Sequence, residues 1–557
     1  MPKDFARRRS SSDSDAGLKS FGMQSRNAPA ICAIAVLLAA AQSASAQVNA
    51  VWVRRYDSGG WQEDRAAGLA LDSAGNVYVT GHAPGTAGDN DFVTVRYRSA
   101  GSREWVQRLD GPNHSEDRPA AIAVGPDGSI YVAGSSNYFS RHSDYTTVKY
   151  SPAGVEQWVR RHNASDSATD VATTLAVAAT GDIVVSGYSG SYPDYDILTI
   201  RYNSAGDTVW TRRYAGPGGG VDRPWAMATD GTGNVYVCGQ SCASVGSPDS
   251  SDMLTLKYGS DGTELWAVRW AGPRGGPDAA LGIAVDSTGN VYVCGFTDAA
   301  AGGSADFVTL KYNAAGDTVW SRTLNGPGNA SDTARAIALD RFGNVCVAGT
   351  CRGESSSQDC ATVRYDSDGA SQWVRYYDHE LGDDAVSAIA VDREGSVYVT
   401  GRSQGSLGGI DFLTVKYNAG GDSLWTARYD DDQGFDAAAA IAVDTAGYVH
   451  VAGTSWNGYS QEDYATVKYQ QSSGIEGERQ VWDGLDVAAR MVITRNWLFL
   501  PPSAVGNPRS VVPLLDISGR IASGLRTGIN DVSRLSPGVY FLQPGRNGRS
   551  LKVIVQH

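Results

Sequence analysis

The feature that most constrains the fold of this chain is an internal repeat. Its first marker is an alanine inside a short apolar run, which recurs at steps of 52 to 56 residues: Ala70, Ala123, Ala176, Ala228, Ala284, Ala338, Ala390 and Ala442. A glycine follows each alanine after 11 residues, and a further run then opens on an aspartate: Asp91, Asp144, Asp196, Asp252, Asp306, Asp359, Asp411 and Asp463. A tyrosine follows each aspartate after six residues. Such periods are typical of architectures in which one supersecondary unit stacks on the next.

Each repeat has the pattern of four β-strands. In the copy at 283–322, short runs of apolar or alternating residues at 283–286, 290–295, 306–312 and 318–322 are separated by turn residues that include Gly289 and Gly316. Alternation of this kind between Gly-containing turns indicates antiparallel strands. One small sheet cannot cover both of its own faces, so neighbouring copies are expected to pack on each other.

The two ends of the repeat region complement each other. Seven copies carry a tryptophan eight residues after the tyrosine, but the eighth copy ends at about Tyr469 without one. The missing fourth strand stands at the other end, where Val51–Tyr56 has the fourth-strand pattern, and Trp52 precedes Asp64 by the same 12 residues that separate Trp105 from Asp117. A strand displaced in this way closes a ring and removes a free sheet edge. The sequence therefore predicts an all-β fold, an eight-bladed β-propeller over 47–470 closed by its N-terminal strand.

Loop lengths predict where such a ring does its work. The first-to-second and third-to-fourth connections keep their length in every copy, whereas the second-to-third and fourth-to-first connections vary. In an antiparallel blade the two variable connections lie on one face, and variable loops on a rigid scaffold commonly carry function. The longest of these loops, residues 240–251, is the first place to look for a departure from the repeat.

Residues 1–46 have the pattern of a signal peptide. A 12-residue apolar stretch (30–41) follows Arg26, and Ala44-Ser45-Ala46 is a small-residue cleavage pattern. Met23 is an alternative start, because the preceding segment is long and polar. The apolar stretch is shorter than the roughly 20 residues that a membrane-spanning helix needs. A secreted or outer-surface location, with no transmembrane segment, is expected.

Charge and cysteine content fit that location. The net charge is −13, and because 1–46 carry +3, the remaining chain carries −16, which argues against nucleic acid as a partner. A monomer is expected. Six cysteines lie beyond residue 46; Cys351 and Cys360 flank the second-to-third loop of one copy, so a disulfide between them is predicted. Cys238 and Cys294 occupy a small-residue position and are expected to be buried thiols.

The repeated side chains are expected to be structural. The eight tryptophans should pack as wedges between blades. A second aspartate stands six residues before each marker alanine, giving two carboxylates per blade that could bind Ca²⁺. The favoured interpretation is that these aspartates accept backbone N–H bonds and pair with the basic residue late in the third run, such as Arg96 or Lys149. No cofactor and no metal are expected. Histidines, serines and acids form no recognisable catalytic set, so no catalytic residue is assigned.

The motif D-x-x-G-N-V-Y-V-x-G, followed by D-F-x-T-x-K-Y and G-D-x-x-W, resembles the bacterial SBBP-type beta-propeller repeat proteins. That resemblance covers roughly 51–469 and implies a secreted or surface propeller without a defined activity. Residues 471–481 are a predicted linker. Residues 482–557 contain strand-like runs near 511–520, 528–533, 535–542 and 551–555, and their D-x-x-G-R, N-D-V-S and L-x-P-G-V-Y-F elements resemble the C-terminal sorting domain of type IX secretion cargo. The resemblance implies a small β-sandwich that engages the type IX secretion machinery.

Two functions of different class are left open. The first is a non-catalytic binding or scaffold propeller that takes a protein or glycan ligand. The second is a secreted polysaccharide hydrolase or lyase that uses the variable-loop face. The first is favoured because every prominent residue is repeated, whereas a catalytic site requires one asymmetric set. Aromatic and acidic side chains gathered over one end of the channel, with raised carboxyl pKa values, would favour the enzyme.

Overall fold

The computed structural model describes the chain between residues 48 and 471, together with strands of a C-terminal segment between 492 and 555. The residues outside this description between 48 and 471 are 60–62, 86–87, 113, 139–141, 165–167, 243–250, 299–303, 354–356, 380–381, 406–408, 432–433 and 457–461. Every helix or strand assigned in the described residues is a β-strand. These residues include no apolar helix of the length that a membrane crossing requires.

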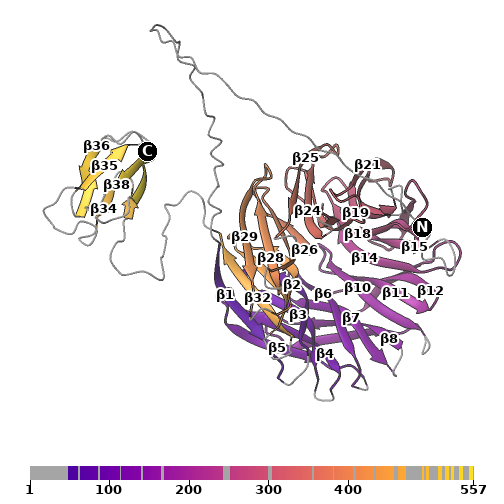
Figure 1. Cartoon of the computed structure of the whole chain (residues 1–557). Coiled ribbons are helices and arrows are strands. Elements are labelled where there is room, and N and C mark those ends of the chain that lie inside the picture. Colours follow the sequence, from indigo (N-terminus) through magenta and orange to yellow (C-terminus); the bar gives the residue numbers. More distant parts are fainter. Residues whose placement is uncertain are drawn as a thin grey trace, which may run out of the picture. The chain divides into compact units, whose positions relative to one another are not determined.

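The strands between residues 49 and 470 form eight four-stranded sheets, the blades of a propeller (Figure 1). Blades 1 and 2 are β2 (Arg65–Leu71), β3 (Val77–Pro84), β4 (Asn90–Tyr97), β5 (Arg103–Leu109), β6 (Asp117–Val124), β7 (Ile130–Tyr138), β8 (His142–Tyr150) and β9 (Glu156–His162). Blades 3 and 4 are β10 (Thr169–Val177), β11 (Ile183–Ser191), β12 (Asp194–Tyr202), β13 (Thr208–Tyr214), β14 (Asp222–Thr229), β15 (Val235–Cys242), β16 (Ser251–Tyr258) and β17 (Glu264–Trp270). Blades 5 and 6 are β18 (Ala279–Val285), β19 (Val291–Asp298), β20 (Ala305–Tyr312), β21 (Thr318–Leu324), β22 (Thr333–Leu339), β23 (Val345–Arg352), β24 (Gln358–Tyr365) and β25 (Ser371–Tyr377). Blades 7 and 8 are β26 (Asp384–Val391), β27 (Val397–Gln404), β28 (Ile410–Tyr417), β29 (Ser423–Tyr429), β30 (Asp436–Val443), β31 (Val449–Trp456), β32 (Glu462–Gln470) and β1 (Asn49–Tyr56).

The ring is closed by the N-terminal strand, as predicted. The eighth sheet has the order β1-β32-β31-β30, and β1 pairs antiparallel with β32 so that Trp52 faces Lys468 and Tyr56 faces Tyr464. Figure 1 shows the indigo β1 beside the orange β32. The last blade is therefore built from both ends of the repeat region, and its edge is covered by a strand that no hairpin ties to it.

The first strand of each blade lies innermost. First strands of neighbouring blades contact one another around the whole ring, and Figure 1 shows β2, β6, β10, β14 and β18 toward its middle. Because all neighbouring strands are antiparallel, the second-to-third and fourth-to-first connections lie on one face, which we call the variable-loop face. The hydrophobic core lies between blades: buried residues of blades 5 and 6, for example, form one cluster that includes Trp320 and Val347.

A bulge in the first strand explains the repeated glycine. In blade 4 the register shifts between Pro224 and Ala226, so that one residue more stands on β14 than on the facing segment of β15. The shift pushes the first strand toward Gly239, and a Cβ there would overlap the carbonyl oxygen of Arg223. All eight marker glycines meet the first strand in the same way, so only glycine fits.

Each tryptophan is packed between its own blade and the next one. Trp210 is 6% exposed, and its Nε1 donates to the backbone oxygen of Ser260 at 3.1 Å. Its indole lies against Gly262, a turn glycine with a φ of +82°, where a Cβ would come within 2.7 Å of the ring. The same bond is made by Trp52, Trp105, Trp158, Trp266, Trp320 and Trp373. The predicted wedge role of these residues is therefore confirmed.

Blade 8 departs from this scheme because the chain leaves it at Gln471 without making a hairpin. Trp425 therefore meets no turn, and its Nε1 has no hydrogen-bond partner among the described residues. Lys416, whose counterparts donate to a turn carbonyl, donates instead to the side-chain oxygen of Gln471. The Gln471 amide in turn donates to the Gly447 carbonyl at 2.5 Å. One side chain thus replaces part of the missing turn.

The C-terminal segment contains two antiparallel sheets. One has the order β33-β34-β37 and the other β36-β35-β38-β39. Their strands are β33 (Val492–Thr494), β34 (Trp497–Leu500), β35 (Val512–Asp516), β36 (Ile521–Leu525), β37 (Gly528–Asp531), β38 (Gly538–Leu542) and β39 (Leu551–Val555). The four strand-like runs expected from the sequence each contain one of these strands. The sandwich packing and the sorting role stay predictions, and the linker at 471–481 lies outside the described residues except for Gln471.

Candidate functional site

The repeated aspartates before the first strands organise the loops of the variable-loop face. The Asp117 carboxylate accepts the backbone N–H of Gly111 at 2.5 Å, and an equivalent bond spanning five or six residues is made in all the other blades. These aspartates are at most 1% exposed. Burial raises the pKa of Asp117 and of Asp436 to about 7. Their expected role as acceptors of loop N–H groups is confirmed.

The aspartates of the third strands have other partners than expected. In five blades they pair with arginines of the fourth strand: Arg213 with Asp196 at 2.5 Å, and likewise Arg55–Asp463, Arg108–Asp91, Arg269–Asp252 and Arg428–Asp411. The expected pairing with the basic residue of the third strand is wrong. Lys149 lies at the far end of its strand, where its Nζ donates to the Ser204 carbonyl of the next blade at 3.0 Å.

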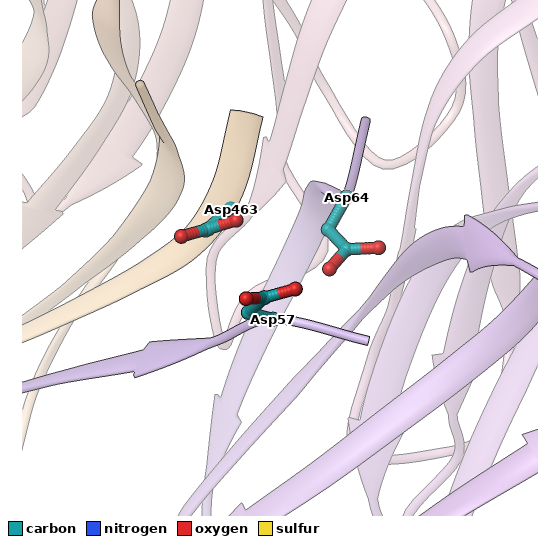
Figure 2. A group of neighbouring side chains, drawn as sticks. All are labelled: Asp57, Asp64 and Asp463. Carbon is teal, nitrogen blue, oxygen red and sulfur yellow. The ribbon is translucent and has the colours of Figure 1, made fainter. Parts of the chain in front are cut away.

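Two groups of three aspartates bring their carboxylate oxygens within 4.8 Å of one another, namely Asp57, Asp64 and Asp463 and, in blade 1, Asp89, Asp91 and Asp110. Figure 2 shows the first group, with Asp463 on the last propeller strand and Asp57 and Asp64 on the segment that follows β1. Both Asp64 oxygens accept bonds from Ser58, and Arg55 pairs with Asp463. Burial raises the pKa of Asp64 to about 6. The Asp64 and Asp463 carboxylates are therefore already engaged by the β1 segment at the seam, where β1 closes the ring against β32. We propose no calcium site there.

A departure from the repeat lies in the β11–β12 hairpin of blade 3, on the variable-loop face. Three tyrosines gather there: the rings of Tyr188 and Tyr195 are 5.2 Å apart in a T-shaped contact, and Tyr192 lies 6.4 Å from Tyr195. The Tyr192 side chain is 77% exposed, the highest value among the large hydrophobic residues of the described chain. Between the marker glycine and the third-strand aspartate, every other blade has at most two Phe, Tyr or Trp residues, as at Tyr138 and Phe139 of blade 2.

An arginine of blade 4 packs on these rings. The Arg223 guanidinium carbon lies 4.8 Å from the Tyr188 ring centroid and 5.5 Å from that of Tyr195, so cation–π contacts hold it. Two other blades have arginine at this position, and there it is paired: Arg65 with Glu462 at 2.6 Å and Arg118 with Glu116 at 3.4 Å. Arg223 has no hydrogen bond or ion pair within the described residues, and its buried Nε lacks a partner.

Trp225 extends the group along β14. It is the extra residue of the bulge, a position taken elsewhere by Ala67, Ala120, Thr173, Leu281, Arg335, Ser387 and Ala439. Its side chain is 44% exposed, and its Nε1 lies 3.4 Å from the Oε1 of Gln240, the register partner of Arg223. Tyr188, Tyr192, Tyr195, Arg223 and Trp225 together form what we call the aromatic patch.

The six cysteines that the structure describes are all buried. Cys238 and Cys294 are fully buried free thiols, as expected. Cys351 and Cys360 are also free in the structure. Cys351 faces Asp359 across the ladder and Cys360 faces Thr350, so their side chains leave the sheet on opposite sides and enter different inter-blade clusters. This geometry does not favour the predicted disulfide, because a bridge requires both Cβ atoms to point toward each other.

Comparison with known proteins places the repeat in a family. Residues 372–408, from the fourth strand of blade 6 through the second strand of blade 7, match the family model SBBP, described as a beta-propeller repeat. This match and the fold together support an SBBP-type β-propeller. The other copies share the spacing of the matched one, which is the resemblance that the sequence motif had indicated.

Similar proteins vary widely in kind. The chain is 33% identical over 147 residues to the regulatory protein FlaEY of Caulobacter vibrioides, a match that covers 24% of this chain and 15% of that protein. Among solved structures, Sqt1 from Chaetomium thermophilum is 12% identical with a TM-score of 0.49, over 76% of this chain and 100% of that one. A PL25 ulvan lyase bound to a GlcA–Rha3S oligosaccharide is 13% identical with a TM-score of 0.38, over 69% and 97% of the two chains. These similarities assign no substrate to this chain.

The aromatic patch lies on the face that the loop lengths favour, but the sequence analysis did not identify its residues. The longest loop, 240–251, which the sequence singles out as the first place to look, consists mostly of residues 243–250, which lie outside the described residues. The aromatic patch lies on the shortest hairpin and on the neighbouring first strand, next to Gln240. Comparing the eight copies position by position would have found Trp225, because no other copy has an aromatic residue there.

Proposed function

We propose that this chain is a secreted or cell-surface propeller that binds a ligand on its variable-loop face without chemical turnover. The observation that carries the proposal is the contrast between repeated and unrepeated residues. Most of the repeated carboxylates have backbone or arginine partners, whereas the residues that break the repeat include exposed rings, Tyr192 and Trp225, and the unpaired cation Arg223. Rigid aromatic side chains beside a cation provide contact area for recognition.

The carboxyl groups do not favour the enzyme alternative. Asp64, Asp117 and Asp436, whose pKa burial raises to about 6 or 7, belong to a set present in every blade and are at most 1% exposed. Asp359, with a pKa raised to about 6, belongs to the third-strand set and is 6% exposed. Asp222, which precedes Arg223, accepts the Gly216 N–H at 2.5 Å and is 1% exposed. A general acid or base must reach the substrate, and these buried, hydrogen-bonded groups are placed to hold loops instead.

Export forms the second part of the proposal. It is supported by the signal-peptide pattern of 1–46 and by the resemblance of 482–557 to type IX sorting domains. In the native host, removing 482–557 from the full chain should leave the propeller in the periplasm, whereas the full chain should reach the cell surface. Surface display of the shortened chain would contradict the type IX route.

Binding is tested with the mature chain, residues 47–557, on an array of glycans and on surface extracts. We expect retention of a ligand class that Tyr192→Ala and Trp225→Ala weaken, with Ser387→Ala as the control because Ser387 is an exposed residue at the same bulge position in blade 7. Release of shorter products from any bound polysaccharide would show that the non-catalytic interpretation is wrong. Binding that neither aromatic variant changes would place the site elsewhere.

A further inference from the structure

The aromatic patch has a chemical preference that its members define. Arg223 is half-buried, held against two tyrosine rings, and without an acidic partner in the part of the chain that the structure describes. Its Nε donor is buried and unsatisfied. The Nη groups of Arg223 are not buried in this way, so its charge, which no described acid neutralises, is available to an anion.

The shape of the guanidinium group indicates which class of anion it would bind. The two Nη groups at the end of a guanidinium present N–H donors side by side, and this edge matches the two oxygens of a carboxylate. Stacking on Tyr188 and Tyr195 fixes the guanidinium plane, so little conformational freedom is lost when the carboxylate binds. The patch contains a single cation, which suits one carboxylate at a time rather than a dense row of charges.

The neighbouring groups suit a sugar ring. Tyr192 and Trp225 expose aromatic surface, which covers the apolar C–H faces of pyranose rings, and Gln240 offers an amide for hydroxyl groups next to Trp225. The chain beyond residue 46 carries −16, so it repels polymers with a charge on every unit. A polysaccharide whose carboxylates are separated by neutral sugars, or a short acidic oligosaccharide, avoids most of that repulsion.

We infer that the aromatic patch binds uronate sugars of a polysaccharide, with Arg223 binding the carboxylate and Tyr192 and Trp225 stacking on the sugar rings. This inference rests on the proposed binding function and names its ligand class. The arginines at the same position in blades 1 and 2 are excluded from this role, because Glu462 and Glu116 already neutralise them.

The test compares a tetragalacturonic acid with its fully methyl-esterified form, titrated into the mature chain in a calorimeter. The acid should bind more tightly than the ester, and the difference should shrink with added salt. Arg223→Gln should weaken binding of the acid by about 10- to 100-fold, the value of a charged hydrogen bond, and leave the ester unchanged. Arg223→Lys should fall between, because an ammonium lacks the paired donors.

Arg118→Gln is the matched control, since Arg118 has the same register position in blade 2 but is paired with Glu116. It should leave both affinities unchanged, and circular dichroism should report the same fold for all variants. Equal affinity for acid and ester, equal losses in the two glutamine variants, or binding of neither sugar would overturn the uronate inference. The array separates this failure from that of the proposed function: retention of another ligand by the patch keeps the binding role, whereas retention of none removes both.

Discussion

Replacing Trp52 by alanine tests ring closure at the seam. Trp52 is 6% exposed, lies against Tyr97 of blade 1, and donates from Nε1 to the Ser99 carbonyl at 3.2 Å. Truncation of a buried tryptophan costs about 3–5 kcal/mol. Strand β1 is not joined to β32 by a hairpin, so this loss should appear first as local opening of β1. We expect amides of 49–56 to exchange roughly 100- to 4,000-fold faster, because every 1.4 kcal/mol changes an opening equilibrium tenfold.

The control for this experiment is Trp210→Ala. Trp210 has the same 6% exposure and an equivalent bond to Ser260, but its strand is tied to blade 3 by a hairpin. This variant should lower the melting temperature without accelerating exchange at 49–56. Hydrogen exchange read by mass spectrometry on the two variants gives the answer. Unchanged exchange at 49–56 in Trp52→Ala, or equal acceleration in both variants, would refute the account of the seam.

Three further predictions concern buried titratable groups. Burial raises the pKa of Asp117 to about 7, above its unfolded value, so the native state binds the proton more tightly than the unfolded state. The melting temperature should therefore fall as pH rises from about 4 to 7 and then level off. Asp117→Asn should flatten this pH dependence. Tyr376 stands where most fourth strands have the arginine that pairs with the third-strand aspartate, which in this blade is Asp359, and burial raises the pKa of Asp359 to about 6. Tyr376→Arg should therefore raise the melting temperature more at pH 8, where Asp359 is ionised, than at pH 5. An equal effect at both pH values would contradict this prediction. A thiol titration of denatured residues 47–557 without reductant should find six thiols, whereas four would show that Cys351 and Cys360 are bridged.

The ring itself follows from the sequence because the repeat contains the information eight times over. The marker glycines, tryptophans and aspartates each face a local packing problem that is the same in every blade, so their spacing fixes strand order and closure. The seam also follows, since the unmatched strand at Val51–Tyr56 completes the unmatched copy that ends near Tyr469. These features depend on contacts within one repeat or between equivalent neighbours, which a comparison of the chain with itself captures.

Side-chain pairing was harder to predict because it depends on strand direction. Asp144 and Lys149 belong to one strand, and five residues along a strand span about 17 Å. They therefore lie at opposite ends of the blade and serve different neighbours, Lys149 reaching the turn of the next blade. The aromatic patch was missed for a similar reason. Arg223 lies 35 residues beyond Tyr188, on the next blade, and the contact between them exists only in the ring.

The partners of the basic residues around the ring explain why Arg223 matters in a protein this acidic. Basic residues that recur in the repeat already have structural partners, since fourth-strand arginines pair with third-strand aspartates and third-strand lysines donate to turn carbonyls. Basic residues that occur in only a few copies have no such repeated partner. Arg65 and Arg118 are then neutralised by nearby glutamates, whereas the loop of blade 3 supplies Arg223 with tyrosines instead of an acid. Aromatic rings hold a guanidinium in place without cancelling its charge, so the substitution of tyrosine for glutamate turns a structural ion pair into a site that still attracts an anion.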